Sequence, residues 1–131
     1  MIPPVVFDID LTLTAERYHN DQVRDLRPNP LMVGLAISLA KSGVPIVIST
    51  ARPERLWHQT WYWLKHQGIV FEDLYMRKDG DDRPDPDVKR QHAESILTNW
   101  GNVLLWYDDN PGNVAVVKNL GIPVILVNRY A

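Results

Sequence analysis

Short apolar runs alternate along the chain with longer stretches of mixed polarity. The apolar runs cover residues 3–9, 44–50, 73–76, 102–109 and 123–128. Each is short and rich in Val, Ile, Leu or aromatic residues, a composition typical of strands that are buried on both faces. The run at 73–76 is the weakest of the five. The pattern therefore predicts five short strands, and it leaves room for a helix after each of the first four.

The stretches between the strands have helical spacing and helical end signals. The four helices are expected at 29–43, 53–67, 86–98 and 112–120. In the first, Asn29 can cap the helix and Pro30 suits its first turn. Leu31, Leu35 and Leu39 fall on one stripe of this helix, which predicts that the stripe faces the core.

The second helix carries a cluster of aromatic residues. Trp57, Trp61 and Leu64 share one face, so core packing is the expectation for both tryptophans. Trp63 and Tyr62 point elsewhere and are the better candidates for stacking on a nucleic-acid base.

Strands that alternate with helices and are apolar on both faces predict a parallel sheet between two layers of helices. We expect a three-layer α/β/α sandwich with a five-stranded parallel sheet. The 131 residues suit one domain, residues 1–131, and leave little room for a second.

Composition removes several classes of function. The absence of cysteine excludes disulfides, zinc–thiolate sites and thiol catalysis, and a cytoplasmic setting is the default expectation. No apolar run approaches the ~20 residues that cross a bilayer, so no membrane partner is expected. A net charge of −2 gives no global attraction for nucleic acid. The G-x-G-x-x-G pattern of a dinucleotide cofactor site does not follow the first strand.

Polar residues follow several of the predicted strands. Asp8 and Asp10 come at the end of the first, Thr50 and Arg52 at the end of the second, and Asp108 and Asp109 after the fourth. Ligands bind at the carboxyl ends of the strands in open parallel sheets, so these residues are expected to gather at one edge, joined by Lys89 from a helix. A hard divalent cation would relieve the carboxylate repulsion, and Mg²⁺ is the usual choice.

These motifs resemble those of the haloacid dehalogenase superfamily of phosphatases. FDIDLTLT is similar to its first motif, IVIST to its second, the lysine in DPDVKRQ to its third, and LLWYDD to its acidic fourth. All four occur in the family's order, and each lies at the expected strand or helix. Leu11 is a departure, because many relatives have glycine there; a change in the following loop is the expected result.

The resemblance implies a role for each matching residue. Asp8 would be the nucleophile that forms an aspartyl-phosphate, and Asp10 would act as general acid and then general base. Mg²⁺ would be held by Asp8, Asp109 and the backbone carbonyl of Asp10. Thr50 and Lys89 would contact the phosphoryl group. Thr12, in the first motif, is assigned to the substrate site, and Asp108 and Asn113 are expected to support the metal ligands through hydrogen bonds.

The spacing of the motifs leaves no room for a folded cap domain, so the expected site is open. Within the capless branch, TAR at 50–52, R-x-D-x-D-V-K at 83–89 and YDD at 107–109 resemble the 3′-phosphatase domain of phage-type polynucleotide kinase/phosphatase. By this resemblance Arg17 and Arg52 would contact the substrate phosphate, and Asp85 would fix Arg52 or Lys89 or simply cap a helix. No P-loop motif is present, so a phosphatase module without its kinase is expected.

Three functions remain open on the sequence alone. The first is a Mg²⁺-dependent phosphatase acting on nucleic-acid 3′ ends, and the second is a nucleotide or small-metabolite phosphatase. The third is a silent module that binds a phosphorylated partner, which the intact Asp8 and Asp10 disfavour. A monomer is favoured. Cations expected at the rim of the open site could guide a polyanion; they are Arg17, Arg24, Arg27, Arg55, Arg77, Lys78 and Arg83.

Overall fold

The computed structural model describes residues 2–128. The strands are β1 (Val5–Phe7), β2 (Ile46–Pro53), β3 (Asp73–Arg77), β4 (Leu105–Asp108) and β5 (Val124–Leu126). The helices are α1 (Pro30–Lys41), α2 (Trp57–His66), α3 (Asp85–Trp100) and α4 (Pro111–Asn119), and a single 3₁₀ turn, η1 (Glu54–Leu56), precedes α2. Every predicted strand and helix is present, with ends that differ by a few residues.

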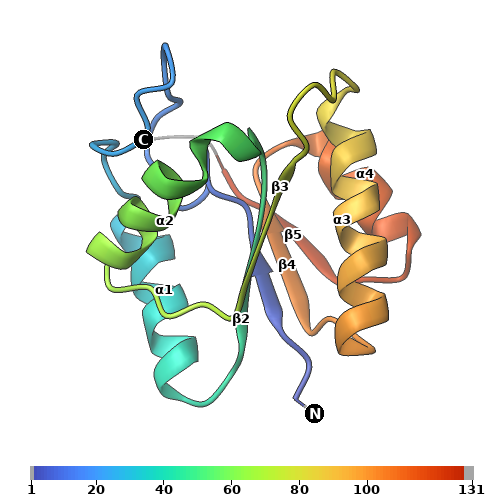
Figure 1. Ribbon diagram of the computed structural model, residues 1–131. Coiled ribbons are helices and arrows are strands. Elements are labelled where there is room, and N and C mark those ends of the chain that lie inside the picture. The colour runs from blue at the N-terminus through green and yellow to red at the C-terminus, as the bar shows by residue number, and fades with distance from the viewer. Residues whose placement is uncertain (1, 129–131) are drawn as a thin grey trace.

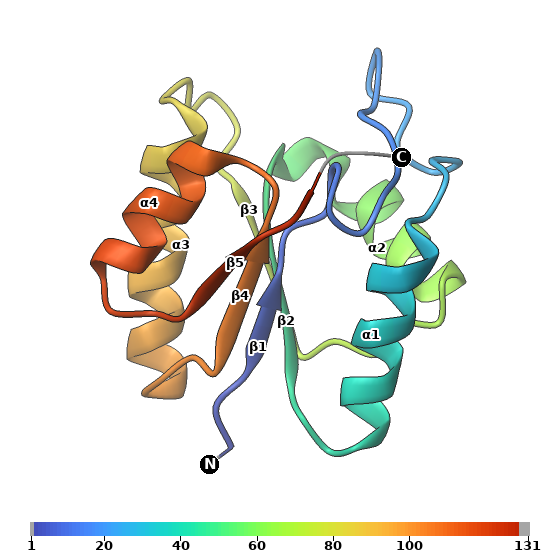
Figure 2. The same ribbon diagram turned by 180° about the vertical axis from the view of Figure 1, so that it is seen from behind.

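The five strands form one parallel sheet in the order β3-β2-β1-β4-β5. Helices α1 and α2 cover one face and α3 and α4 cover the other (Figure 1), as the view from behind also shows (Figure 2). The chain runs outward from β1 through β2 to β3, and then returns to β4 on the other side of β1. The predicted three-layer sandwich is confirmed, and its switch point lies between β1 and β4, where this class of sheet binds ligands.

The core has two layers because successive side chains of a strand point to opposite faces of the sheet. Val5 and Phe7 pack on the side of α1 and α2, together with Trp63, whereas Val6 packs on the side of α3 and α4 with Trp106. All five side chains are at least 96% buried. The central strand is therefore held from both faces, and its carboxyl end is fixed in position.

The end signals of α1 were read correctly, but its buried face was not. The Asn29 side chain caps the helix by accepting a hydrogen bond from the Met32 N–H. Leu31 is 79% exposed, whereas Met32, Val33 and Ala36 face the core. Leu35 and Leu39 pack only at the margin of that core.

The prediction for the aromatic residues of α2 was wrong. Trp63 is fully buried and donates its indole N–H to the Leu26 carbonyl at 2.8 Å, while Trp57 and Trp61 are 40% and 39% exposed. The buried stripe of the helix consists of Thr60, Trp63 and Leu64, which are spaced i, i+3, i+4. The buried face of the helix is therefore rotated relative to the predicted one. Trp63 lies in the core, and Trp57 and Trp61 lie at the surface.

The connections at the carboxyl edge are loops and single helices. Within residues 2–128, β1 is joined to β2 by a loop and α1, and β2 is joined to α3 by η1, α2, β3 and a loop. Neither connection contains a cap domain. None of the helices in this part of the chain has the length and apolar character needed to span a membrane.

Candidate active site

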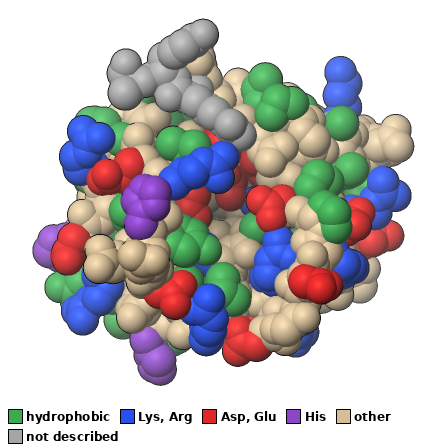
Figure 3. Space-filling model, turned by 90° about the horizontal axis from the view of Figure 1, so that it is seen from above, with side chains coloured by type: hydrophobic (Ala, Val, Ile, Leu, Met, Phe, Trp, Pro, Cys, Tyr) green, Lys and Arg blue, Asp and Glu red, His purple; other side chains and the backbone are tan. Residues whose placement is uncertain are grey.

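A pocket of about 450 Å³ opens at the carboxyl edge of the sheet. Figure 3 looks down into this hollow, which has acidic side chains and basic side chains around it. Eight of the site residues proposed from the sequence lie in its wall: Asp8, Asp10, Arg17, Arg52, Asp85, Lys89, Asp109 and Asn113. The other three, Thr12, Thr50 and Asp108, are not wall residues of the pocket.

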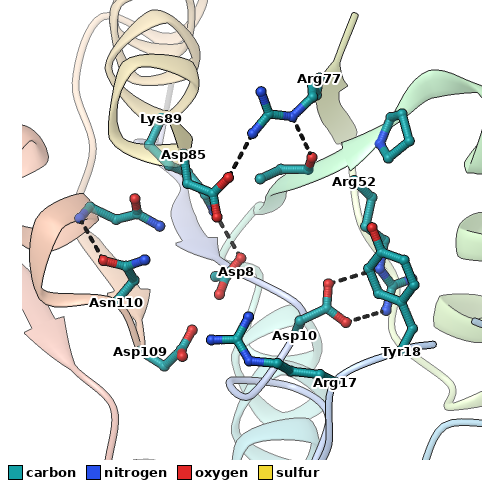
Figure 4. A pocket seen from close by; sticks show the side chains of 13 residues that line it. Asp8, Asp10, Arg17, Tyr18, Arg52, Arg77, Asp85, Lys89, Asp109 and Asn110 are labelled. Atoms are coloured by element: carbon teal, nitrogen blue, oxygen red, sulfur yellow. Dashed lines mark hydrogen bonds and ion pairs between the residues drawn. The ribbon is translucent and has the colours of Figure 1, made fainter. Parts of the chain in front are cut away.

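The floor of the pocket is an ion pair between Asp8, which directly follows β1, and Lys89 of α3 (Figure 4). Lys89 donates from Nζ to Asp8 Oδ1 at 2.8 Å and to the Ser49 carbonyl oxygen at 2.5 Å. Its Nζ also lies 3.2 Å from Asp108 Oδ2. Lys89 has no exposed surface, so three oxygens replace the water that an ammonium group would otherwise bind.

The charges of the floor are unequal, because the carboxylates outnumber the single ammonium group. Burial works against the charged form of Lys89, but the carboxylates of Asp108 and Asp8 outweigh it and raise the pKa of Lys89. Burial, followed by the charge of Asp108, raises the pKa of Asp8 well above that of an ordinary carboxyl. We conclude that Lys89 stays protonated, whereas burial and the charge of Asp108 disfavour the ionised form of Asp8.

The surplus of acceptors fits a cation. Oxygen atoms of Asp8, Asp108 and Asp109 lie within 4.8 Å of one another, and all three residues are buried. The Thr12 hydroxyl is 3.3 Å from Asp8 Oδ2 and 3.5 Å from Asp109 Oδ1. Asn113 Oδ1 is buried with no hydrogen-bond partner among the described residues. Clustered oxygen ligands of this kind suit a hard divalent cation such as Mg²⁺.

Asp108 already has several partners. Its oxygens accept from the Trp106 indole at 3.3 Å, the Asn110 N–H at 3.1 Å and the Asn113 amide at 3.2 Å, in addition to the contact with Lys89. These bonds also fix Asn113 with its nitrogen toward Asp108. This arrangement accords with the prediction that Asp108 and Asn113 support the site; that role remains a prediction.

The two aspartates of the first motif point in different directions. β1 ends at Phe7, and the Ile9 carbonyl then accepts hydrogen bonds from the N–H groups of Thr12, Leu13 and Thr14. The turn places Leu11 at φ 62°, a left-handed conformation that costs a non-glycine residue ~1–2 kcal/mol. Because the strand stops before Asp8, the alternation that would put Asp8 and Asp10 on one face does not apply.

Asp10 is held by Arg52. Arg52 donates from Nε and Nη2 to the two oxygens of Asp10, at 3.0 and 2.7 Å, and from Nη1 to the Thr60 hydroxyl at 3.2 Å. Arg52 is 1% exposed and lies beneath the Tyr18 ring, with its guanidinium carbon 5.4 Å from the ring centroid. A two-point pair of this kind fixes both the position and the plane of the Asp10 carboxylate.

Asp85 has a different partner from the expected ones. Its Oδ1 accepts from Arg77 Nη2 at 2.6 Å, so it fixes Arg77 rather than Arg52 or Lys89. It does not cap α3 either, because Pro84 occupies the N-cap position and no side-chain capping bond is present there. Asp85 is already the first residue of the helix, so its carboxylate is directed at the neighbouring strand.

Thr50 is fully buried within β2, three residues before the strand ends at Pro53. Its hydroxyl accepts a hydrogen bond from the Arg52 N–H at 3.2 Å. The position fits a supporting contact for Arg52, and the proposed contact of Thr50 with phosphate remains a prediction. Thr12 likewise bridges two carboxylates, and its assignment to the substrate is untested.

Sequence reasoning placed Arg77 on the open rim, but the structure places it inside the pocket wall. Its Nε donates to the Ala51 carbonyl at 2.9 Å, and its Nη1 donates to the carbonyls of Arg83 at 2.6 Å and Asp81 at 3.1 Å. Arg77 thereby ties the loop after β3 to the end of β2. Its place at the carboxyl end of a strand was the available signal.

Other predicted rim cations are paired with neighbours. Arg27 contacts Glu16, Arg55 contacts Asp21, and Arg83 contacts Asp81. Arg17 differs, because it makes no hydrogen bond or ion pair within residues 2–128 that would hold its guanidinium, which points over the pocket between Asp10 and Asp109 (Figure 4). Tyr18 beside it was not predicted, and nothing in the periodicity of its irregular loop marks it.

His92 supports the floor from behind. Its Nε2 faces the Met76 carbonyl at 3.0 Å and must donate to it, so Nδ1 accepts from the Ser49 hydroxyl at 2.8 Å. Burial, and then the charge of Lys89, lower the pKa of His92 to about 4. The neutral ring links α3 to β2 and β3 beside the Ser49 carbonyl that binds Lys89.

The fold and the arrangement of this site are those of a haloacid dehalogenase-type phosphatase without a cap, a hydrolase acting on phosphate esters. Residues 3–130 match the family model described as the polynucleotide kinase PNKP phosphatase domain, and the chain belongs to that family. No curated protein matches the sequence.

Solved structures share the fold. A chain in "Structure of the Pnkp1/Rnl/Hen1 RNA repair complex" is similar with a TM-score of 0.88 and 20% identity; the match covers 98% of this chain and 43% of that one. The D,D-heptose 1,7-bisphosphate phosphatase from B. bronchiseptica, complexed with magnesium and phosphate, has a TM-score of 0.65 and 14% identity, covering 95% of this chain and 80% of that one. This chain thus spans less than half of the Pnkp1-complex chain.

Proposed function

We propose that the protein is a Mg²⁺-dependent phosphomonoesterase that removes 3′-phosphates from polynucleotide ends through an aspartyl-phosphate on Asp8. The observation that carries this proposal is the placement of Asp8 at the floor of an open pocket. Lys89 lies on one side of it, a group of oxygen ligands on the other, and Asp10 is held nearby by Arg52.

The metal would be held by Asp8, Asp109 and the backbone carbonyl of Asp10, with Asn113 Oδ1 as a further acceptor for the metal or its water. A bound Mg²⁺ supplies positive charge that shields the nucleophile from the negative charge of the phosphate. The buried carboxylates and the unpartnered Asn113 oxygen support this assignment.

Asp8 would attack the phosphorus atom while the bond to the ester oxygen breaks. The departing alkoxide is a poor leaving group at neutral pH, and a positioned acid accelerates such a step by ~10²–10⁴. Asp10 would donate that proton and then accept one from the water that hydrolyses the aspartyl-phosphate. The two hydrogen bonds from Arg52 fix the position and the plane of the Asp10 carboxylate.

Lys89 would hold Asp8 in place and offset charge on the phosphoryl oxygens. Arg17, whose guanidinium lies over the pocket, would contact the same oxygens from the open side. The Thr50 hydroxyl would act through the Arg52 backbone or bind a phosphoryl oxygen after a small movement.

Two facts support a polynucleotide substrate. The family is that of the polynucleotide kinase PNKP phosphatase domain, and a similar fold occurs in the RNA repair complex named above. The pocket is also open, which suits a phosphate at the end of a long chain. A nucleotide or small-metabolite phosphatase is the second candidate, favoured by a pocket large enough for a whole small ligand and by the paired state of several rim cations.

The test is a panel of substrates hydrolysed in Mg²⁺. The panel compares 3′-phosphorylated oligonucleotides, 5′-phosphorylated oligonucleotides, mononucleotides and sugar phosphates, with Asp8→Asn protein as the blank. We expect the 3′-phosphorylated oligonucleotide to have the highest kcat/KM. Equal hydrolysis of mononucleotide and oligonucleotide at low salt would instead support the small-molecule phosphatase.

The same panel tests the metal. Chelation should stop hydrolysis, added Mg²⁺ should restore it, and Ca²⁺ should support it poorly because Ca²⁺ prefers more ligands at longer distances. Full activity in excess chelator would contradict the metal assignment.

A further inference from the structure

We propose that the polynucleotide leaves the active-site pocket past Arg17, follows a groove between the loop at 15–27 and α2, and places a base in an apolar hollow formed by Trp61, Tyr62 and His58. This inference rests on the proposed function and adds to it a binding site for the strand upstream of the 3′-phosphate. The occupant is single-stranded nucleic acid.

The route is continuous along the surface. Arg17 lines both the active-site pocket and the neighbouring groove, which has a volume of about 640 Å³. Arg24 and Gln59 line both that groove and a third hollow of about 260 Å³. Each cavity therefore shares wall residues with the next, from the phosphate site to the far hollow. A chain that begins at Asp8 can follow this path only if it is long and flexible.

The far hollow is suited to a flat ring. Its walls are aromatic or planar, formed by Trp61, Tyr62 and His58, with the Arg24 guanidinium 4.1 Å above the Tyr62 ring. The Trp61 ring is held by Trp57, whose centroid lies 6.2 Å away at an angle of 17°. Trp61 and Tyr62 are 39% and 40% exposed, so parts of both rings are accessible from solvent. Aromatic rings and guanidinium groups are the partners on which bases stack.

Charge in the groove favours a strand bound by its bases more than by its phosphates. The groove wall contains three carboxylates; Glu16 is paired with Arg27 and Asp21 with Arg55, and Asp25 is the third. Arg17 and Arg24 remain to meet backbone phosphates. The Gln59 Oε1 atom is buried with no hydrogen-bond partner in the described structure, and an acceptor there suits the N–H groups of a base or a ribose hydroxyl.

A peptide or an apolar small molecule fits less well. Neither would account for a route that begins at a phosphate-ester site and passes two arginines before it reaches stacked rings. A duplex does not fit this site, because bases that are paired within a duplex are not free to enter the hollow and stack there. The proposal therefore predicts a preference for a single-stranded 3′ end.

Binding can be measured without turnover. Asp8→Asn protein is titrated with 5′-fluorescein single-stranded oligonucleotides of one to eight nucleotides that end in a 3′-phosphate, and affinity is read by anisotropy. We expect affinity to rise with length over the first few nucleotides and then to level off. Stacking of one base at the hollow corresponds to about tenfold or more in affinity. A blunt duplex with the same 3′-phosphate should bind more weakly than the single strand.

Variants then locate the site. Trp61→Ala and Tyr62→Ala should each lower the ratio of kcat/KM for the eight-nucleotide substrate to that for the 3′-mononucleotide by about tenfold. Trp61→Phe and Tyr62→Phe keep a ring and should restore most of the ratio. Leu104→Ala is the matched control, because Leu104 is 46% exposed and lies outside the three cavities. Thermal melting identifies any variant that has lost its fold, and Arg24→Gln then tests the same hollow from the loop.

The outcomes separate the two proposals. If no 3′-phosphate is hydrolysed at any length, the proposed function is wrong. If 3′-phosphates are hydrolysed but affinity does not depend on length, or if Trp61→Ala and Tyr62→Ala leave the ratio unchanged, the groove is not the path of the strand. Equal binding of duplex and single strand would also overturn this inference while leaving the phosphatase intact.

Discussion

At the floor of the pocket Asp8 and Asp108 are buried and both pair with Lys89, whereas at the rim the Arg17 guanidinium and the rings of Trp61 and Tyr62 meet solvent. The floor comes from the ends of β1 and β4 and from the first turns of α3, all held by the two core layers. Much of the rim comes from an irregular loop. The same chain thus contains a rigid part that can perform chemistry and an exposed part that can select what reaches it.

The comparison teaches that the two parts should respond differently to change. A substitution at the floor leaves a buried charge or a catalytic step unsupported, and its effect should not depend on the substrate. A substitution at the rim removes a contact that water can replace, so its effect should vary with substrate length and with salt.

The largest effect is expected for Asp8→Asn. The amide keeps the shape of the side chain but cannot attack phosphorus, so turnover should fall by roughly 10⁴-fold or more, as for other lost nucleophiles. Phosphate release on the best substrate measures the loss. The melting temperature without metal should not fall, because the variant removes one of the crowded carboxylates. Asp21→Asn is the rim control and should remain active; substantial activity in Asp8→Asn protein would remove Asp8 as nucleophile.

Lys89→Met tests whether the floor depends on its only buried ammonium group among the described residues. The change leaves Asp8 and Asp108 without their cation, which typically costs about 3–5 kcal/mol of folding free energy. Urea unfolding measures the difference in folding free energy. Lys78→Met is the control, because the Lys78 side chain is 75% exposed and its ion pair with Glu54 is long, at 3.9 Å. Added Mg²⁺ should stabilise the Lys89 variant more than the wild type. An unchanged stability would show that the carboxylates of the floor are neutral in the free protein.

His92 lies just behind the floor and should make stability depend on pH. Its folded pKa of about 4 is below the unfolded value of 6.5, so between these values the unfolded chain binds more protons. This contribution to stability is therefore complete above pH 6.5 and is lost as pH falls toward 4, by about 3 kcal/mol. His92→Asn lacks this titration, so the difference between the urea stabilities of wild type and variant should shrink in that range. Parallel pH curves for the two proteins would refute the assignment.

The smallest effect is expected at the rim, on salt dependence. The advantage of a 3′-phosphorylated oligonucleotide over the 3′-mononucleotide should shrink as salt rises, because each backbone phosphate that is contacted adds counterion release. Lys78→Gln should weaken the longer substrate by a fewfold at most. Arg77→Gln should weaken both substrates, since Arg77 ties together the end of β2 and Asp85. If Lys78→Gln weakens both substrates equally, Lys78 does not contact the backbone phosphates of the oligonucleotide.

Much of the fold and the floor could be predicted from the sequence because both follow from local rules. Apolar runs of strand length determine the layers, and the carboxyl ends of parallel strands must meet at one edge, which brings Asp8 and Asp109 together across the sheet. The cap of α1 at Asn29 is equally local. Such features need no knowledge of how distant loops pack.

The remaining features depend on tertiary contacts. Whether Asp85 binds Arg52, Lys89 or Arg77 is set by where the loop after β3 runs, and no periodicity records that path. The burial of Trp63 instead of Trp57 depends on the rotation of one helix by a fraction of a turn. Tyr18 lies in a loop without regular structure, so its place beside the pocket emerges only in three dimensions, and Arg17 in the same loop was expected there only through the family resemblance.

The central position of β1 also imposes an order on folding. β1 pairs with β2, the next strand along the chain, but its other edge pairs with β4, and Lys89 is 81 residues beyond Asp8. On a chain emerging from the ribosome, β1 and β2 can associate early, while the far edge of β1 keeps unpaired peptide groups until residue 105 has been made. Insertion of β4 then closes that edge and completes the acidic cluster in a single late event. A chain that stalls or ends before β4 would therefore expose the unpaired edge of β1, which can associate with other chains. It would also lack catalytic activity, because the acidic cluster is incomplete without β4.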